Sequence, residues 1–221
     1  MRKKEVAEKA LLEQKILPLY YHDSAEVSIE ILKALYDGGV RILEYTNRGE
    51  AALDNFSELR KAVDKGMPDL QLGIGTIKTK KQARKYIEAG ADFIVSPSIN
   101  EEVGEVVQDE KLLWIPGCMT PTEIATAENA GAEIVKIFPG NLLGPAYISS
   151  IKDLFPALRF IVTGGVEVEE GNLKAWFKSG VVGVGMGSKL ITKEILLSRN
   201  YDALRAETAR ALQLVKQAVA E

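Results

Sequence analysis

The sequence predicts an α/β fold, a (β/α)8 TIM barrel with an extra N-terminal helix. Three observations lead to this expectation. Short apolar segments alternate with segments of helical spacing about eight times, which is typical of parallel strands joined by right-handed crossovers, and eight such units close into a barrel. The length of 221 residues suits one barrel with short loops. No linker or low-complexity stretch interrupts the pattern, so residues 1–221 are expected to form a single (β/α)8 barrel domain.

The predicted strands are short, rich in β-branched or aromatic residues, and mostly bounded by turn residues: Ile16–Tyr21, Val40–Thr46, Leu70–Thr76, Phe93–Pro97, Leu112–Gly117, Ile134–Pro139, Arg159–Thr163 and Val181–Val184. The predicted helices between and after them often end at glycine: Ala25–Tyr36, Ala51–Lys65, Lys80–Ala89, Glu101–Gln108, Pro121–Ala130, Pro145–Leu154, Glu169–Lys178 and Tyr201–Ala220. Thr120 is a plausible N-cap, because Pro121 follows it at the first helical position. An amphipathic helix over Lys4–Gln14, with Val6, Ala10 and Leu11 on one side, should cover one end of the barrel.

An open, doubly wound sheet is the alternative arrangement of such units. That fold would place a glycine-rich nucleotide-binding turn after the first strand. The residues found there, Tyr20-Tyr21-His22-Asp23, contain no glycine. The closed barrel is therefore the favoured interpretation.

Composition excludes several classes of function. The 28 basic and 31 acidic residues give a net charge of −3, so no nucleic-acid or membrane-surface partner is expected. One cysteine and one histidine exclude an internal disulfide and make a Cys or His metal cluster implausible. No apolar run is long enough to span a bilayer, and Met1 to Gln14 lacks an apolar signal core. We expect a cytoplasmic protein that acts on a small molecule.

The segment 134–139 carries the most informative residue. It reads as a strand buried on both faces, with Ile134, Lys136 and Phe138 on one face because side chains alternate along a strand. An ammonium among apolar neighbours is costly to bury, and a lowered pKa would leave a neutral, nucleophilic amine that can form a Schiff base with a carbonyl substrate. The alternative is an edge-strand lysine whose head reaches water.

Polar and glycine residues gather at the carboxyl ends of the predicted strands, where barrels of this type carry their catalytic groups. The segments are Glu44-Tyr45-Thr46-Asn47-Arg48, Gly73-Ile74-Gly75-Thr76, Ser96-Pro97-Ser98, Thr163-Gly164-Gly165 and Gly183-Val184-Gly185-Met186-Gly187-Ser188. Taken singly, each could be a surface carboxylate, a helix cap or a tight turn. Together they would surround Lys136 with a proton shuttle and an anion clamp. The glycines after the seventh and eighth strands predict a phosphate site made by backbone N–H groups, with tight packing of short loops as the alternative.

Seven motifs stand in a fixed order from the second strand to the eighth: Glu44-x-Thr46-x-Arg48, Gly73-x-Gly75-Thr76, Ser96-Pro97, Ile115-Pro116-Gly117, Val135-Lys136-x-Phe138-Pro139, Thr163-Gly164-Gly165 and Gly187-Ser188. This set resembles the 2-keto-3-deoxy-6-phosphogluconate / 4-hydroxy-2-oxoglutarate aldolase family. The resemblance implies a class I lyase on an (α/β)8 barrel, with no metal or other cofactor and usually a homotrimer. It implies cleavage of a 2-keto-3-deoxy-6-phospho sugar acid, or of 4-hydroxy-2-oxoglutarate, to pyruvate and glyceraldehyde 3-phosphate or glyoxylate.

The resemblance also implies roles, residue by residue. Lys136 would be the Schiff-base lysine and Glu44 the acid/base. Arg48 and Thr76 would bind the substrate carboxylate. Pro97, Phe138 and Thr163 would line the pocket, and Gly164, Gly165, Gly187 and Ser188 would receive the distal phosphate. The chain departs from the family pattern at Tyr45, Asn47 and Met186, and His22 and Cys118 receive no role.

Two other classes of function fit the same barrel. A phosphosugar isomerase or epimerase would use Glu44 as its base and the glycine loops for phosphate, without covalent lysine chemistry. A non-catalytic sugar-acid-phosphate binding protein on the same scaffold would need neither a catalytic base nor covalent lysine chemistry.

Overall fold

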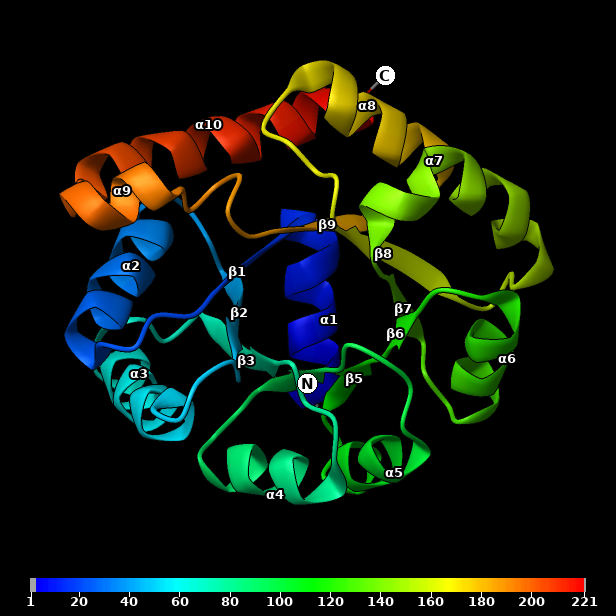
Figure 1. The fold of residues 1–221 in the computed structure, drawn as a ribbon, viewed down its shortest axis with the longest axis horizontal. Helices are drawn as coiled ribbons and strands as arrows, with labels where there is room; N and C mark the ends of the chain where they lie inside the picture. Colours follow the sequence, from blue (N-terminus) through cyan, green and yellow to red (C-terminus); the bar gives the residue numbers. More distant parts are fainter. Residues whose placement is uncertain (1–2, 221) are drawn as a thin grey trace.

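The computed structural model describes residues 3–220, whose strands form one nine-stranded parallel sheet in the order β5-β4-β3-β2-β1-β9-β8-β7-β6. The two outer strands of this order, β5 (Leu113–Ile115) and β6 (Gly117–Cys118), follow each other in the chain and are separated only by Pro116. They are two halves of one predicted strand, so the sheet returns to its starting point and the arrangement is a (β/α)8 barrel (Figure 1). The predicted fold class is confirmed.

The bounds of the elements lie close to those predicted. The remaining strands are β1 Ile16–Tyr20, β2 Ile42–Thr46, β3 Gln71–Gly75, β4 Phe93–Val95, β7 Ile134–Ile137, β8 Arg159–Thr163 and β9 Gly183–Met186. The helices are α1 Lys3–Gln14, α2 Ala25–Asp37, α3 Ala52–Gly66, α4 Lys80–Glu88, α5 Glu101–Asp109, α6 Pro121–Asn129, α7 Gly140–Ile151, α8 Glu170–Ser179, α9 Lys193–Ser198 and α10 Tyr201–Ala220, with a 3-10 turn at Lys152–Leu154. Helix α7 starts earlier than predicted, and the short α9 was not predicted.

The fifth strand is split because Pro116 has no N–H to continue the ladder. On one side of the break, the Ser96 N–H donates to the Ile115 carbonyl at 3.0 Å. On the other side, the Pro116 carbonyl accepts from the Lys136 N–H at 2.8 Å. The strand therefore changes neighbours at Pro116, from β4 to β7, and this closes the ring beside Lys136.

Inward-facing side chains fill the barrel below its carboxyl-terminal end. They come from alternate strand positions and form one buried cluster with α1: Ala7, Leu11, Leu17, Ile42, Phe93, Val95, Leu113, Ile115, Ile134 and Ile161. Helix α1 thus covers the amino-terminal end, as predicted, and is seen through the ring in Figure 1. The predicted inner face of this helix was only partly right, because Ala7 and Leu11 are fully buried while Val6 and Ala10 are only partly buried.

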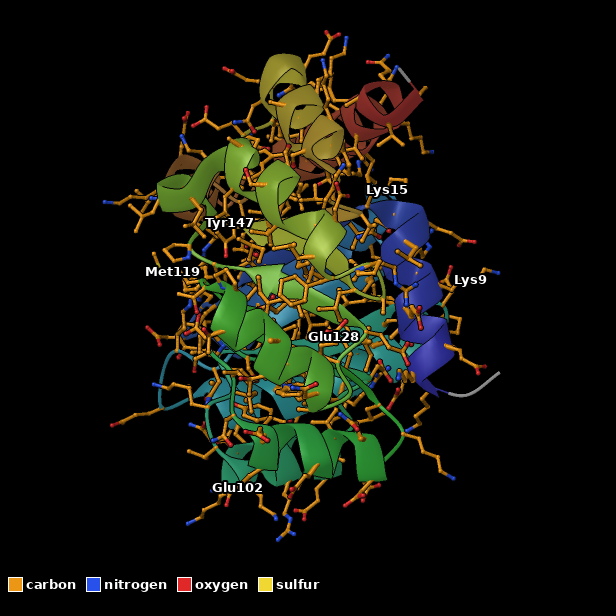
Figure 2. All side chains as sticks on the ribbon, turned by 90° about the vertical axis from the view of Figure 1, so that its right-hand side faces the viewer. Lys9, Lys15, Glu102, Met119, Glu128 and Tyr147 are labelled. Carbon is orange, nitrogen blue, oxygen red and sulfur yellow. The ribbon has the colours of Figure 1, made fainter. Side chains whose placement is uncertain are left out.

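The two ends of the barrel have different contents. Figure 2 shows α1 with Lys9 and Lys15 at one end, and Met119 and Tyr147, which follow the carboxyl ends of β6 and β7, toward the other. Helices begin at this second end. At α6, for example, the Glu123 N–H donates to the Thr120 hydroxyl at 3.3 Å and the Glu123 carboxylate accepts from the Thr120 N–H at 2.8 Å, so the predicted cap is confirmed as a capping box. None of the helices within residues 3–220 is long and apolar enough to cross a membrane.

Candidate active site

Lys136 lies on the inward face of β7, on the same face as Ile134 and at the level where the barrel opens. Strand β7 pairs with β6 on one side and β8 on the other, so the edge-strand alternative is wrong. The side chain is buried, with only 5% of the residue exposed. Its Nζ lies 5.2 Å from the centroid of the Phe138 ring, which attracts a cation weakly. The amine is therefore held inside the ring of strands.

Glu44 lies on the inward face of β2 and is 3% exposed. Its register neighbours are Leu19 on β1 and Gly73 on β3. The carboxylate occupies space that a glycine leaves open, because a Cβ on Gly75 would lie 1.6 Å from Glu44 Oε1. The second oxygen, Oε2, is buried and accepts no hydrogen bond from any residue in the described part of the chain. A buried, unpartnered acceptor of this kind is costly unless a ligand or a water completes it.

The charges of Lys136, Glu44 and Arg48 act on one another. Burial lowers the pKa of Lys136 from its ordinary 10.5; the Glu44 carboxylate opposes this shift and the Arg48 guanidinium adds to it. Burial raises the pKa of Glu44 above its ordinary 4.5, against the attraction of Lys136 and then of Arg48. The amine is thus moved toward its neutral, nucleophilic form, and the carboxyl group toward the neutral pH range in which general acids and bases work.

Arg48 and Thr76 follow the carboxyl ends of the neighbouring strands β2 and β3. The side chain of Arg48 is exposed, yet its charge reaches both Lys136 and Glu44. Thr76 has a φ of +64°, a left-handed conformation that is unusual for a β-branched residue. Residues held in such conformations occur most often at functional sites. The residues that precede Arg48 and Thr76 are joined through the backbone, since the Asn47 N–H donates to the Gly75 carbonyl at 2.9 Å.

The other predicted pocket residues also lie at the carboxyl-terminal end. Phe138 is 36% exposed and forms part of the rim. Pro97 is half-buried, and its carbonyl oxygen lies 2.4 Å from where a Cβ on Gly117 would be. The Thr163 hydroxyl is buried, finds no partner among residues 3–220, and fills space that Gly185 leaves open. The inward positions at this end thus combine glycines, such as Gly117 and Gly185, with a polar group, the Thr163 hydroxyl, that has no hydrogen-bond partner within residues 3–220.

The predicted phosphate loops have the conformation of glycine-rich turns. Gly164 and Gly165 have φ values of +98° and +73°, which glycine adopts without strain. Two α8 side chains that the sequence analysis missed, Asn172 and Trp176, donate to the Gly165 carbonyl at 3.0 and 3.2 Å. They hold this carbonyl toward α8 and so fix the orientation of the loop.

A second contact ties the loop after β8 to the loop after β9. Lys189, which follows Gly187 and Ser188, pairs with Glu167 at 2.8 Å. The four predicted phosphate residues therefore belong to two loops that are joined at the rim. Neither this pair nor the α8 contacts could be read from a local sequence pattern.

Three residues of uncertain role are accounted for by structure. Burial raises the pKa of the Cys118 thiol to about 12, so it stays protonated and is a poor nucleophile. His22 Nδ1 accepts from the Ser24 N–H at 3.0 Å, and the His22 carbonyl accepts from the Tyr45 hydroxyl at 2.9 Å. Met186 is buried in the outer layer between strands and helices and does not line the mouth. Within residues 3–220, no group of three or more His, Cys, Asp or Glu is placed to hold a metal ion.

Comparison with known proteins agrees with this geometry. The sequence model of the family described as "Aldolase: KDPG and KHG aldolase" matches residues 7–206. The chain belongs to this family. Its members are lyases, and the chain is an enzyme of the aldehyde-lyase type, similar to 2-dehydro-3-deoxy-phosphogluconate aldolase.

Individual relatives cover most of the chain. The 2-dehydro-3-deoxy-phosphogluconate aldolase of Treponema pallidum is 30% identical over 207 residues, 93% of this chain and 96% of that protein. The 2-dehydro-3-deoxy-6-phosphogalactonate aldolase of Escherichia coli is 38% identical over 120 residues, 54% of this chain and 58% of that protein. A KDPG aldolase from Legionella pneumophila, solved with pyruvate captured at low pH as a covalent carbinolamine intermediate, has a TM-score of 0.83 at 25% identity and covers 91% of this chain and 96% of its own.

Proposed function

We propose that this aldolase cleaves a 2-keto-4-hydroxy acid to pyruvate and an aldehyde through an imine on Lys136. The observation that carries the proposal is the burial of Lys136 in one barrel with Glu44, whose Oε2 has no hydrogen-bond partner within residues 3–220. A buried amine whose pKa is lowered is the form that condenses with a ketone. The carbinolamine captured in the related Legionella pneumophila enzyme supports the same chemistry here.

The reaction follows from these two groups. Neutral Lys136 Nζ attacks C2 of the keto acid, and loss of water gives a protonated imine. Glu44 accepts the proton of the C4 hydroxyl, the C3–C4 bond breaks, and its electron pair flows into the imine to form an enamine while the aldehyde leaves. Protonation at C3 regenerates the imine, and hydrolysis frees pyruvate and the amine. The positive imine is the electron sink that makes the bond cleavage possible.

The remaining residues of the site would bind the two ends of the substrate. Arg48 can pair with the C1 carboxylate by a charge-assisted hydrogen bond, with Thr76 beside it. Pro97 and Phe138 would wall the pyruvyl part, and Thr163 would line the pocket.

The far end of the substrate would lie against the loops after β8 and β9. Backbone N–H groups of Gly164, Gly165 and Gly187, with the Ser188 hydroxyl, are suited to a phosphate. We therefore propose a 2-keto-3-deoxy-6-phospho sugar acid as the substrate, with glyceraldehyde 3-phosphate as the aldehyde product. 4-Hydroxy-2-oxoglutarate, which gives glyoxylate, is the second candidate, since the matching family model covers aldolases of both kinds.

Reductive trapping tests the proposal. The protein is incubated with pyruvate and borohydride, and peptides are examined by mass spectrometry for a reduced adduct. We expect the adduct on Lys136, its loss in Lys136→Arg, and its retention in the control Lys78→Arg, because Lys78 is an exposed lysine at the same end of the barrel. Absence of an adduct, or an adduct that survives Lys136→Arg, would overturn the proposal. An isomerase or a non-catalytic binding protein would form no adduct.

We also propose that the enzyme is a homotrimer and needs no metal, which is what the resemblance implies, and that it is cytoplasmic, which the charged N-terminal segment favours. Light scattering of the purified protein should give three times the chain mass. Cleavage should persist after treatment with EDTA. A monomer in solution, or activity restored only by a divalent metal, would contradict these two expectations.

A further inference from the structure

The loop that carries Arg48 is fixed from a distant part of the chain. Asn47, the residue before Arg48, accepts a hydrogen bond from the Tyr86 hydroxyl at 2.9 Å, across 39 residues of sequence. The Asn47 N–H donates to the Gly75 carbonyl, and the Arg48 N–H donates to the Thr46 carbonyl, both at 2.9 Å. The residue in front of Arg48 is therefore held by its side chain and by its backbone.

Tyr86 is itself a rigid anchor. It lies on α4, is 3% exposed, and packs edge-on against Phe56, with ring centroids 5.3 Å apart at 90°. Burial raises the pKa of its hydroxyl well above the ordinary 10.0, so the group stays a hydrogen-bond donor throughout the working pH range. A buried ring with one fixed donor can hold a loop without paying much entropy.

The residue after Arg48 is fixed as well. A Cβ on Gly49 would lie 2.0 Å from the Tyr21 hydroxyl, so the Tyr21 side chain lies directly against this glycine. The same hydroxyl donates to Asp23 at 2.5 Å, which holds the Tyr21 ring in place. Arg48 is therefore an exposed side chain between two residues that are both in contact with tyrosine side chains.

We infer that Tyr86, acting through Asn47, is a positioning residue that determines where Arg48 presents its guanidinium to the carboxylate of the keto acid. Neither Tyr86 nor Asn47 touches the reacting atoms. Their effect falls on binding of the pyruvyl end, so it changes the substrate concentration required rather than the rate of bond cleavage. The inference rests on the proposed function, since it takes Arg48 as the group that binds the carboxylate.

The variant Tyr86→Phe tests this by removing only the hydroxyl. We expect the pyruvate concentration for half-maximal borohydride trapping to rise about two- to tenfold, the range for loss of one neutral hydrogen bond. The kcat for cleavage should stay close to that of the unaltered enzyme. Tyr36→Phe is the matched control, because the Tyr36 hydroxyl donates to Asp69 at the opposite end of the barrel. It should leave the half-maximal concentration unchanged.

A double-mutant cycle distinguishes positioning from a general loss of stability. Arg48→Ala should raise the half-maximal concentration of pyruvate, and adding Tyr86→Phe to it should have no further effect. Additive effects, or an unchanged concentration in Tyr86→Phe alone, would overturn the inference while the adduct on Lys136 still supported the proposed function. An unchanged concentration in Arg48→Ala would overturn the inference together with the role of Arg48. Failure of the unaltered enzyme to form an adduct would remove the inference and the proposed function together.

Discussion

Gly75→Ala is the sharpest perturbation that the site allows, because it moves the carboxylate of Glu44 without changing any ionisable group. An ideal Cβ at Gly75 lies 1.6 Å from Glu44 Oε1 and 2.4 Å from its Cδ. Non-bonded heavy atoms settle at about 3.5–4.0 Å, so the carboxylate must retreat by roughly 2 Å.

The displacement sets the expected loss of activity. A misplacement of about 1 Å in an active site can cost around 100-fold in rate. We therefore expect kcat for cleavage to fall by about 100-fold or more. Overpacking of the barrel interior should also reduce the free energy of unfolding by about 1–3 kcal/mol. Trapping of pyruvate should persist, because Lys136 itself is not displaced.

The assay is pyruvate release, coupled to lactate dehydrogenase, together with urea unfolding of each variant. Gly73→Ala is the matched control, since a Cβ there would overpack the same interior but would meet the Phe93 ring first, at 2.3 Å. It should lose similar stability and keep kcat within about tenfold, because no group of the site is displaced. Unimpaired cleavage in Gly75→Ala, or an equal loss of kcat in Gly73→Ala, would refute the reasoning.

Three further expectations follow from the charges and the packing. Arg48→Gln should move the acid limb of the pH profile of kcat/KM to higher pH, because Arg48 lowers the pKa of Lys136 and that of Glu44 and both groups act in their deprotonated forms; a shift to lower pH would contradict the assignment. In the unaltered protein, the free energy of unfolding should rise with pH up to about 10.5, because below that pH the unfolded chain binds a proton that the folded Lys136 amine has lost. Lys136→Met should abolish this rise. Urea unfolding at several pH values measures this, and a slope that survives in Lys136→Met would count against it. Leu11→Ala should cost about 2–5 kcal/mol in thermal or urea unfolding with kcat retained, whereas Leu197→Ala, at a residue 76% exposed, should cost little; equal costs would contradict the packing of α1.

Much of the fold was predictable because most strands and helices have a recognisable pattern in their own sequence segment. Alternation in 134–139 placed Ile134 and Lys136 on one face, and the structure shows that face to be the barrel interior. The capping box at Thr120 is likewise a contact between residues three apart, which the sequence displays directly. Local rules of this kind hold whatever the rest of the chain does.

What could not be predicted depends on contacts between distant segments. The missing N–H of Pro116 is visible in the sequence, but the strands on either side of the break, β4 and β7, come from distant segments that no local pattern identifies. The amphipathic pattern predicted for helix α1 is nearly absent, so only the fit to the barrel end selects Ala7 over Val6. The hydrogen bond from Tyr86 to Asn47 joins residues 39 apart, and Asn47 could be noted only as a departure from the family pattern.

Helix α1 has a consequence for the order of events in the proposed reaction. Side chains packed against this helix, among them Leu17, Ile42 and Ile161, are fully buried, so within residues 3–220 they close the α1 end of the barrel behind the amine. A water that comes from solvent to hydrolyse the imine would then enter by the same opening through which the aldehyde departs. While the aldehyde remains in that opening it excludes this water, so its departure would have to come before release of the three-carbon product.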